Sequence, residues 1–177
     1  ITMNDLDTIA AIATPPGDGG IGIIRVSGPK AFVITDQIFK SFDGLSCNTR
    51  EHGRFNFGKI INSNRDTIDH AIVLIMRNPH SFTGDDTSEI QLHGGIIILN
   101  EVLSMILKLG ARLAENGEFS KRAFVNGKID LTQAEAICDL ISAKSKRAAQ
   151  IAVNQLEGDL SNAVSYTHLT LPTRYRV

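Results

Sequence analysis

The sequence predicts an α+β fold, a mixed sheet with a few helices, followed by a second, helical unit. Strand-like and helix-like segments follow one another without strict βαβ alternation up to about Gly127. The hydrophobic period changes from two residues to about 3.6 after Gly95, and a strongly signalled helix start follows at Asp130. We therefore expect a first domain over residues 1–127 and the first helix of a helical domain over residues 128–164.

The composition is that of an ordinary globular protein. The 177 residues are 42% hydrophobic and 21% charged, and the formal net charge is -1. Such a balance supplies no strong field for nucleic acid or an anionic membrane, which argues against an autonomous RNA-binding module. The first residues do not have the pattern of a signal peptide, and no apolar run is long enough to span a bilayer. We expect a soluble, cytoplasmic protein with no membrane partner.

The elements of the first domain follow from local patterns. Short apolar or alternating segments predict strands, in which Phe55 and Phe57 share one face. Apolar residues at helical spacing predict two helices, the second ending at Gly110, and Ser120 is expected to cap a short third helix that ends at Gly127. Strands are expected over residues 8–14, 21–27, 54–61, 67–76, 88–93 and 112–114, and the first two helices over residues 31–39 and 96–110.

The last predicted helix has the clearest start and an uncovered apolar seam. Asp130 is a good N-cap, and Gln133 stands where a capping box places it. Apolar or small residues then recur in steps of three and four up to Leu160, with Ser145 as the one weak position. An exposed seam of this length is costly, so the helix either dimerises or belongs to a bundle whose other helices lie outside this chain. We favour the bundle.

Two features resemble known sites but lack the necessary context. The string GDGGIG, residues 17–22, precedes a strand-like segment, whereas a dinucleotide-binding loop follows a strand and opens a helix. We interpret it as a turn between strands, and the P-loop string GxxxxGK[ST] does not occur in the sequence. Cys47 and Cys138 stand far apart without a CxxC motif, so we expect two reduced, packed thiols and no metal site.

Arg25 and Glu89 are the candidate polar residues of the predicted strands. Arg25 has apolar neighbours and needs an anionic partner, because burying a cation unpaired is costly. A structural ion pair and a clamp on a carboxylate ligand both satisfy that need. Glu89 lies in an alternating segment, so it shares one strand face with Gln91 and His93.

Further candidates stand near predicted helix ends. Gly94 and Gly95 let a ligand approach the backbone, where the free amides of a helix N-terminus can bind it. For His93, a satisfied structural histidine is favoured over a metal ligand. Arg122 and Lys128 bring positive charge near two helix ends, where a solvated helix face and a functional role are equally compatible with the spacing.

Four strings resemble one family: DTIAAIATPPGDGGIGIIRVSG, HSFTGDDTSEIQLHGG, GEFSKRAFVNGKIDLTQAEAICDLI and QLEG. They follow the order seen at the N-terminus of the bacterial MnmE (TrmE) tRNA-modification GTPases, and the match runs from Asp7 to about Val164. The resemblance implies a first domain related to the tetrahydrofolate-binding domains of aminomethyltransferases. That domain forms the homodimer and binds a tetrahydrofolate derivative, 5-formyl or 5,10-methylene. A helical domain follows, with a GTPase domain inserted into it.

The resemblance also implies an activity for the parent protein. With the flavin-dependent partner MnmG, also called GidA, the family forms 5-carboxymethylaminomethyl or aminomethyl uridine at the wobble position of tRNA, and the folate is the one-carbon donor. The family's folate contacts carry over to Arg25, Glu89 and Lys128, and the candidate pocket neighbours are His93, Gly94, Gly95 and Arg122.

The chemistry of a reduced folate agrees with these residues. A carboxylate such as Glu89 accepts two hydrogen bonds from the amino-amide edge of the pterin, while Arg25 and Lys128 suit the acidic tail or a formyl oxygen. The family's GTPase motifs and its cysteine-bearing C-terminal tail do not occur in the sequence. We therefore expect that this chain has no catalytic residue of its own and does not modify tRNA alone. We also expect that it neither binds GTP, with the accompanying Mg²⁺ and K⁺, nor hydrolyses GTP.

Two alternatives stay open. One is a self-sufficient folate-dependent one-carbon transferase, for which only Glu89 and His93 are candidate acid-base groups. The other is a purely structural dimerisation module with an empty pocket. Residues 165–177 depart from the family pattern and contain a helix-stopping Pro172, so we interpret them as a foreign tail without function.

Overall fold

The computed structural model describes residues 7–17 and 19–157, which form two compact units. The first unit ends at Ala123 and contains the sheet, whereas the second begins at Phe124 and is helical. The predicted α+β class is confirmed. Residues 158–164 of the predicted helix and the predicted tail, 165–177, lie outside the described residues.

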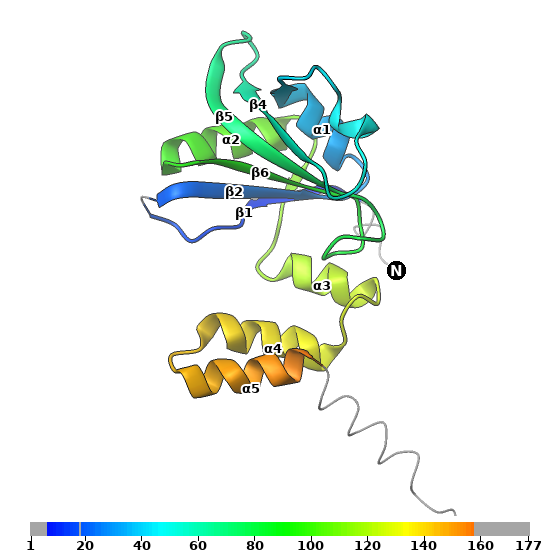
Figure 1. The fold of residues 1–177 in the computed structure, drawn as a ribbon, viewed down its shortest axis with the longest axis vertical. Coiled ribbons are helices and arrows are strands. Elements are labelled where there is room, and N and C mark those ends of the chain that lie inside the picture. The colour runs from blue at the N-terminus through cyan, green and yellow to red at the C-terminus, as the bar shows by residue number, and fades with distance from the viewer. Residues whose placement is uncertain (1–6, 18, 158–177) are drawn as a thin grey trace, which may run out of the picture. The chain divides into compact units, whose positions relative to one another are not determined.

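Within the described residues, the first unit is built on one seven-stranded mixed sheet (Figure 1). Its order is β3-β4-β5-β6-β2-β1-β7, and every neighbouring pair is antiparallel except β1 and β7. The GDGGIG string belongs to the connection between antiparallel neighbours β1 and β2 and to the start of β2, as predicted. The strands are β1 (Ile9–Ile12), β2 (Gly19–Ser27), β3 (Phe39–Ser41), β4 (Phe55–Ile61), β5 (Thr67–Met76), β6 (Thr87–Gly94) and β7 (Arg112–Leu113).

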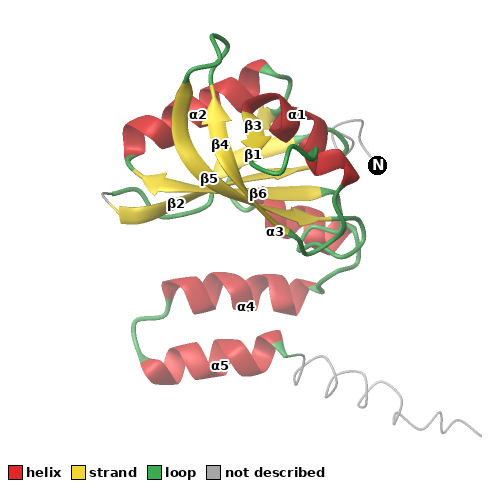
Figure 2. Cartoon of the chain, turned by 45° about the horizontal axis from the view of Figure 1, so that its top comes forward, coloured by secondary structure: helices red, strands yellow, loops and turns green. Residues whose placement is uncertain are grey.

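Two helices, α1 (Ala31–Ile38) and α2 (Ile96–Lys108), cover one face of this sheet (Figure 2). Alternate strand residues point toward them, because side chains of a strand alternate between the two faces. Ile24, Val73 and Ile90 are completely buried in the resulting core, and burying each contributes about 2 kcal/mol. The remaining alternate residues of β2, β4, β5 and β6 lie on the opposite face, which we call the open face.

Two local predictions need correction. The three-residue strand β3 was not predicted, because it is too short to show alternation. Helix α3 (Glu118–Val125) begins before Ser120, which therefore lies inside the helix and is not its cap. The carboxylate of Glu118 instead accepts the N–H of Glu115 at 2.7 Å and ties the first turn to the preceding loop. Gly127 does end this region in a left-handed conformation with a φ of 67°, as predicted.

The two cysteine thiols differ in burial. Cys47 is buried, as predicted, and burial together with the nearby Asp36 carboxylate raises the pKa of its thiol to about 12. The backbone N–H of Cys47 donates to Asp36 at 2.6 Å, which holds the loop after β3 against α1. Cys138, on the second unit, is exposed, so the prediction of a packed thiol was wrong there.

The second unit contains two helices, α4 (Leu131–Ser142) and α5 (Lys146–Leu156), in place of the single long helix predicted. The capping box at Asp130 and Gln133 is present as predicted, with reciprocal hydrogen bonds of 2.8 and 3.0 Å. The chain breaks at Ser145, whose hydroxyl accepts the N–H of Ala148 at 3.1 Å and caps α5. Serine competes with the helical backbone for hydrogen bonds, which explains why the weak position in the seam is the break.

The seam of the predicted helix therefore folds back on itself. Ala136 of α4 and Ala152 of α5 are buried where the two helices pack, and Gln133 donates a hydrogen bond of 2.8 Å to the carbonyl of Leu156. Hence α4 and α5 partly cover each other, and the expectation that this chain offers no partner for the seam was wrong. In the part of the chain that the structure describes, no helix has the length and apolar character to cross a bilayer.

Candidate functional site

Arg25 and Glu89 lie opposite each other on β2 and β6 and form an ion pair. The guanidinium Nε and Nη2 of Arg25 stand 2.8 and 2.7 Å from Oε1 of Glu89. The Arg25 and Glu89 side chains are 26% and 16% exposed, so the pair is largely withdrawn from water but still reachable. Among the described residues, no donor is hydrogen-bonded to the second oxygen, Oε2 of Glu89, which leaves that atom available to a ligand.

Two aromatic rings hold the Arg25 guanidinium in place. Phe82, from the connection between β5 and β6, and Phe119, from α3, lie with their centroids 5.6 and 5.3 Å from its Cζ. Each cation-π contact stabilises the charge by roughly 0.5–1 kcal/mol or more where water is excluded. Neither phenylalanine was predicted as a site residue, because a contact between distant segments leaves no local pattern in the sequence.

The ion pair belongs to the open face, which carries large apolar side chains. Strand register places Leu74 of β5 beside Glu89 and Phe55 of β4 beside Leu74. Exposed apolar residues of this face are Ile21 (65%), Phe55 (69%), Phe57 (58%) and Ile72 (38%). Exposed apolar groups gathered on one face mark a surface that binds a partner or a ligand.

His93 shares this face with Glu89 and Gln91, as the alternation predicted. Its ring Nδ1 lies 2.6 Å from Oδ1 of Asp69, and its backbone N–H donates to Oδ2 at 2.9 Å. Burial raises the pKa of the Asp69 carboxyl, but the hydrogen bonds from the backbone and ring of His93 outweigh it and hold that pKa below its ordinary value of 3.8. This geometry agrees with a satisfied histidine, and no metal-binding cluster of three His, Cys, Asp or Glu occurs within residues 7–17 and 19–157.

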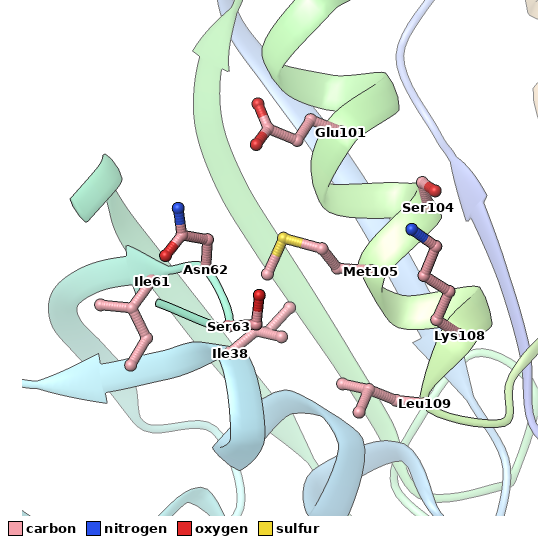
Figure 3. A pocket seen from close by; sticks show the side chains of 9 residues that line it. All are labelled: Ile38, Ile61, Asn62, Ser63, Glu101, Ser104, Met105, Lys108 and Leu109. Atoms are coloured by element: carbon pink, nitrogen blue, oxygen red, sulfur yellow. The ribbon is translucent and has the colours of Figure 1, made fainter. Parts of the chain in front are cut away.

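A hollow of about 320 Å³ adjoins His93 on the open face. A larger hollow of about 440 Å³ lies on the other face, against α2. Figure 3 shows Met105 of the larger hollow pointing from α2 toward Ser63 and Ile38. This larger hollow contains none of the predicted site residues. The smaller one is lined by Gly20, Ile21, Phe57, His70, Ala71, Ile72, Gln91, Leu92 and His93.

The glycines after His93 have different roles. A Cβ on Gly94 would stand 2.3 Å from the carbonyl oxygen of Gly19, so the close approach of β2 and β6 requires glycine there. Strand packing thus accounts for Gly94 without a ligand. Gly95 is the N-cap of α2, and a Cβ there would meet only Ile98, at 4.0 Å.

Arg122 and Lys128 are placed differently from Arg25 and Glu89. Arg122 is 6% exposed and donates to the carbonyl of Asp7 at 2.7 Å and to the Glu118 carboxylate at 3.3 Å. Its charge is therefore engaged in an ionic cluster that joins α3 to the start of β1. Lys128 belongs to the second unit, in the segment between α3 and α4. Of the three predicted folate contacts, the first unit thus brings two together.

Comparison with known proteins identifies the family. A family model described as "GTP-binding protein TrmE N-terminus" matches residues 8–128. The chain is 48% identical over 163 residues to the tRNA modification GTPase MnmE of Streptococcus thermophilus, covering 92% of this chain and 35% of that protein. The protein of the same name from Clostridioides difficile is 50% identical over 158 residues, which cover 89% of this chain and 34% of that protein. The one from Bacillus subtilis is 49% identical over 160 residues, which cover 90% of this chain and 35% of that protein.

The chain thus spans about a third of the length of the curated relatives it matches. The family model covers well over half of its residues, including the sheet with Arg25 and Glu89. From these matches and the α+β fold, the chain belongs to the MnmE (TrmE) tRNA-modification GTPase family and contains its N-terminal domain.

Proposed function

We propose that this chain binds a reduced folate one-carbon donor, 5-formyl- or 5,10-methylenetetrahydrofolate, on the open face of its sheet. The observation that carries the proposal is the Arg25–Glu89 pair, fixed by two phenylalanine rings and reachable from the open face. A preorganised ion pair beside apolar side chains suits a ligand with a flat, polar ring and an apolar arm.

In this proposal Glu89 recognises the pterin. Oε2 of Glu89 accepts from the amino-amide edge, and Oε1 keeps Arg25 in position. The Arg25 guanidinium has further N–H groups for a ring carbonyl or formyl oxygen of the ligand. Lys128 is the third contact by family resemblance, and its ammonium group suits the formyl oxygen of the ligand. Arg122 is left out of the ligand site, since its charge is engaged with Asp7 and Glu118.

The second part of the proposal concerns oligomerisation. We propose that two copies of the chain associate through the open face, as a homodimer. The exposed Phe55, Phe57 and Ile21 support this, because burial of such side chains drives association. The ion pair and these residues share one face, so the second copy would also shield the bound folate from water.

The proposed role in the cell is that of the parent family. The parent protein would act in the cytoplasm with a flavin-dependent MnmG (GidA) partner to form carboxymethylaminomethyl or aminomethyl uridine at the tRNA wobble position. In this role the N-terminal domain supplies the folate-bound carbon, and GTP hydrolysis belongs to the GTPase domain of the parent.

Calorimetric titration with 5-formyltetrahydrofolate tests the ligand assignment. Glu89→Gln should weaken binding at least tenfold, because a charge-assisted acceptor for the pterin is replaced by a neutral amide. Glu101→Gln, which removes the same charge from an exposed position of α2 on the opposite face, is the matched control and should bind like the wild type. Unchanged affinity in Glu89→Gln would contradict the assignment.

The same samples separate the alternatives. A light-scattering mass of a dimer without any folate-dependent rise in melting temperature would favour the purely structural module, since a ligand specific to the native state must stabilise it. Transfer of a one-carbon unit from methylenetetrahydrofolate to an amine by this chain alone would favour the self-sufficient transferase.

A further inference from the structure

Along β6, the ion pair has room for a ligand on one side only. On the side toward Thr87, the space is filled by the hydroxyl groups of Ser27, Thr83 and Thr87, which are at most 1% exposed. Ser27 lies within hydrogen-bond distance of both threonines, at 2.7 and 3.0 Å. On the other side, along β6, Gln91 lines the 320 Å³ hollow and stands two residues from Glu89, about 7 Å along the strand. A long ligand that is anchored at Glu89 and follows β6 therefore extends into this hollow.

The lining of the hollow changes from apolar to basic. Ile21, Phe57 and Ile72 provide apolar and aromatic walls, and His70 and His93 stand among them. Lys59 is the cross-strand neighbour of His70 and adds a positive charge on the same side of β4. None of the residues that line the described hollow is acidic. Such a lining fits an aromatic ring that carries an anionic group.

Asp69 determines which nitrogen of His93 can reach a ligand. Its carboxylate is 9% exposed and accepts the backbone N–H groups of His70 and His93 at 2.8 and 2.9 Å. An ionised carboxylate can only accept, so the 2.6 Å contact with Nδ1 of His93 requires the hydrogen on Nδ1. The outward atom is then Nε2, on a side chain that is 72% exposed. Nε2 carries a hydrogen only in the imidazolium form of the ring, and in that form it donates a hydrogen bond to an anion.

We propose that this hollow binds the p-aminobenzoyl-glutamate arm of the folate, with the aryl ring against Phe57 and Ile72 and a glutamate carboxylate hydrogen-bonded to Nε2 of His93. This inference rests on the folate-binding function proposed above and extends it to the opposite end of the ligand. His70, from the neighbouring strand, supplies a second donor for the same acidic tail. The pterin end thus meets an acidic side chain and the glutamate end meets basic ones, which fixes the direction of the ligand on the sheet.

A comparison of two ligands on the same variants tests this proposal. Calorimetry is performed with 5-formyltetrahydrofolate and with 5-formyltetrahydropteroate, which has the pterin and the aryl ring but lacks the glutamate. His93→Gln should weaken folate binding about tenfold, the loss of one hydrogen bond to a charged group, and leave pteroate binding unchanged. His70→Gln should show the same selectivity and serves if His93→Gln fails to fold, because the His70 ring contacts the exposed side chains of Phe42 and Phe57.

Glu89→Gln separates the test of the pterin site from the test of the placement of the glutamate arm. This variant should weaken both ligands equally, since both contain the pterin. If it does so while His93→Gln and His70→Gln weaken neither ligand, or weaken both to the same extent, the placement of the glutamate arm is overturned and the pterin site stands. If neither ligand binds the wild-type chain, the proposed function and this inference are both overturned.

Discussion

Gly94 lets β6 and β2 approach closely because it has only a hydrogen where other residues have a side chain. The position that a Cβ would take lies 2.3 Å from the backbone oxygen of Gly19, and a backbone atom cannot rotate away. The position where the sequence suggested room for a ligand is therefore filled by the neighbouring strand. Glycine at this position thus serves the packing of two strands and not the approach of a ligand. Strand alternation and composition do not distinguish these two roles.

We predict that Gly94→Ala lowers the free energy of unfolding by about 2–3 kcal/mol, the usual cost of overpacking. Gly20→Ala is the control, because nothing lies within 4 Å of its Cβ position, and it should change stability by less than about 0.5 kcal/mol. Urea denaturation followed by circular dichroism measures both. Equal stability of the two variants would show that the strands move apart without cost.

Single residues also show what could be predicted of the site. Arg25 was expected to need an anion, and Glu89 was expected on one face with Gln91 and His93; the structure pairs the first two directly. That Arg25 faces Glu89 depends on β2 pairing with β6, and the segments are too far apart in sequence for local pattern to reveal their pairing. Asp69 was not predicted as the partner of His93 for the same reason.

At the scale of elements, α3 is joined to the sheet edge by an ionic cluster. Arg112 of β7 donates to Glu118 at 2.6 and 3.1 Å, and Arg122 contacts both Glu118 and Asp7. Hydrogen bonds from Arg112 outweigh the effect of burial and hold the pKa of Glu118 below its ordinary value of 4.5. Because the folded-state pKa is lowered, this stabilisation is complete above pH 4.5 and is lost as the pH falls through the lower folded-state value.

We predict that Glu118→Gln destabilises the first unit by about 3 kcal/mol at pH 7, because Arg122 stays buried with one carboxylate fewer. The variant should also lose less stability than the wild type when the pH is lowered below 4.5. Glu115→Gln, an exposed neighbour, is the control and should follow the wild-type pH profile. Parallel pH profiles for Glu118→Gln and the wild type would contradict the role of this carboxylate.

The ends of helices could be predicted where the capping residues are close together in the sequence. The prediction failed where a helix end depends on residues that meet only in the folded protein. Asp130 and Gln133 lie three residues apart, so the sequence contains the whole capping box. The break before α5 was visible only as a weak position at Ser145, since a serine at helical spacing is compatible with both a continuous helix and a new N-cap. The start of α3 depends on Glu118 and Arg112, which come together only in the folded sheet.

At the scale of the whole molecule, the fold class followed from the order of strand-like and helix-like segments, but the sheet order did not. Placing β6 between β5 and β2 creates the open face with Phe55, Phe57 and the Arg25–Glu89 pair. The sequence showed these residues as separate alternating segments. Their gathering on the open face is the structural basis for proposing that ligand binding and dimerisation share a surface.

A structure of this chain with 5-formyltetrahydrofolate tests the central claim most directly. We predict the pterin on the open face, with its amino-amide edge within hydrogen-bond distance of Oε2 of Glu89. Ligand bound elsewhere, for example against Met105 in the hollow beside α2, with the Arg25–Glu89 pair untouched, would contradict it.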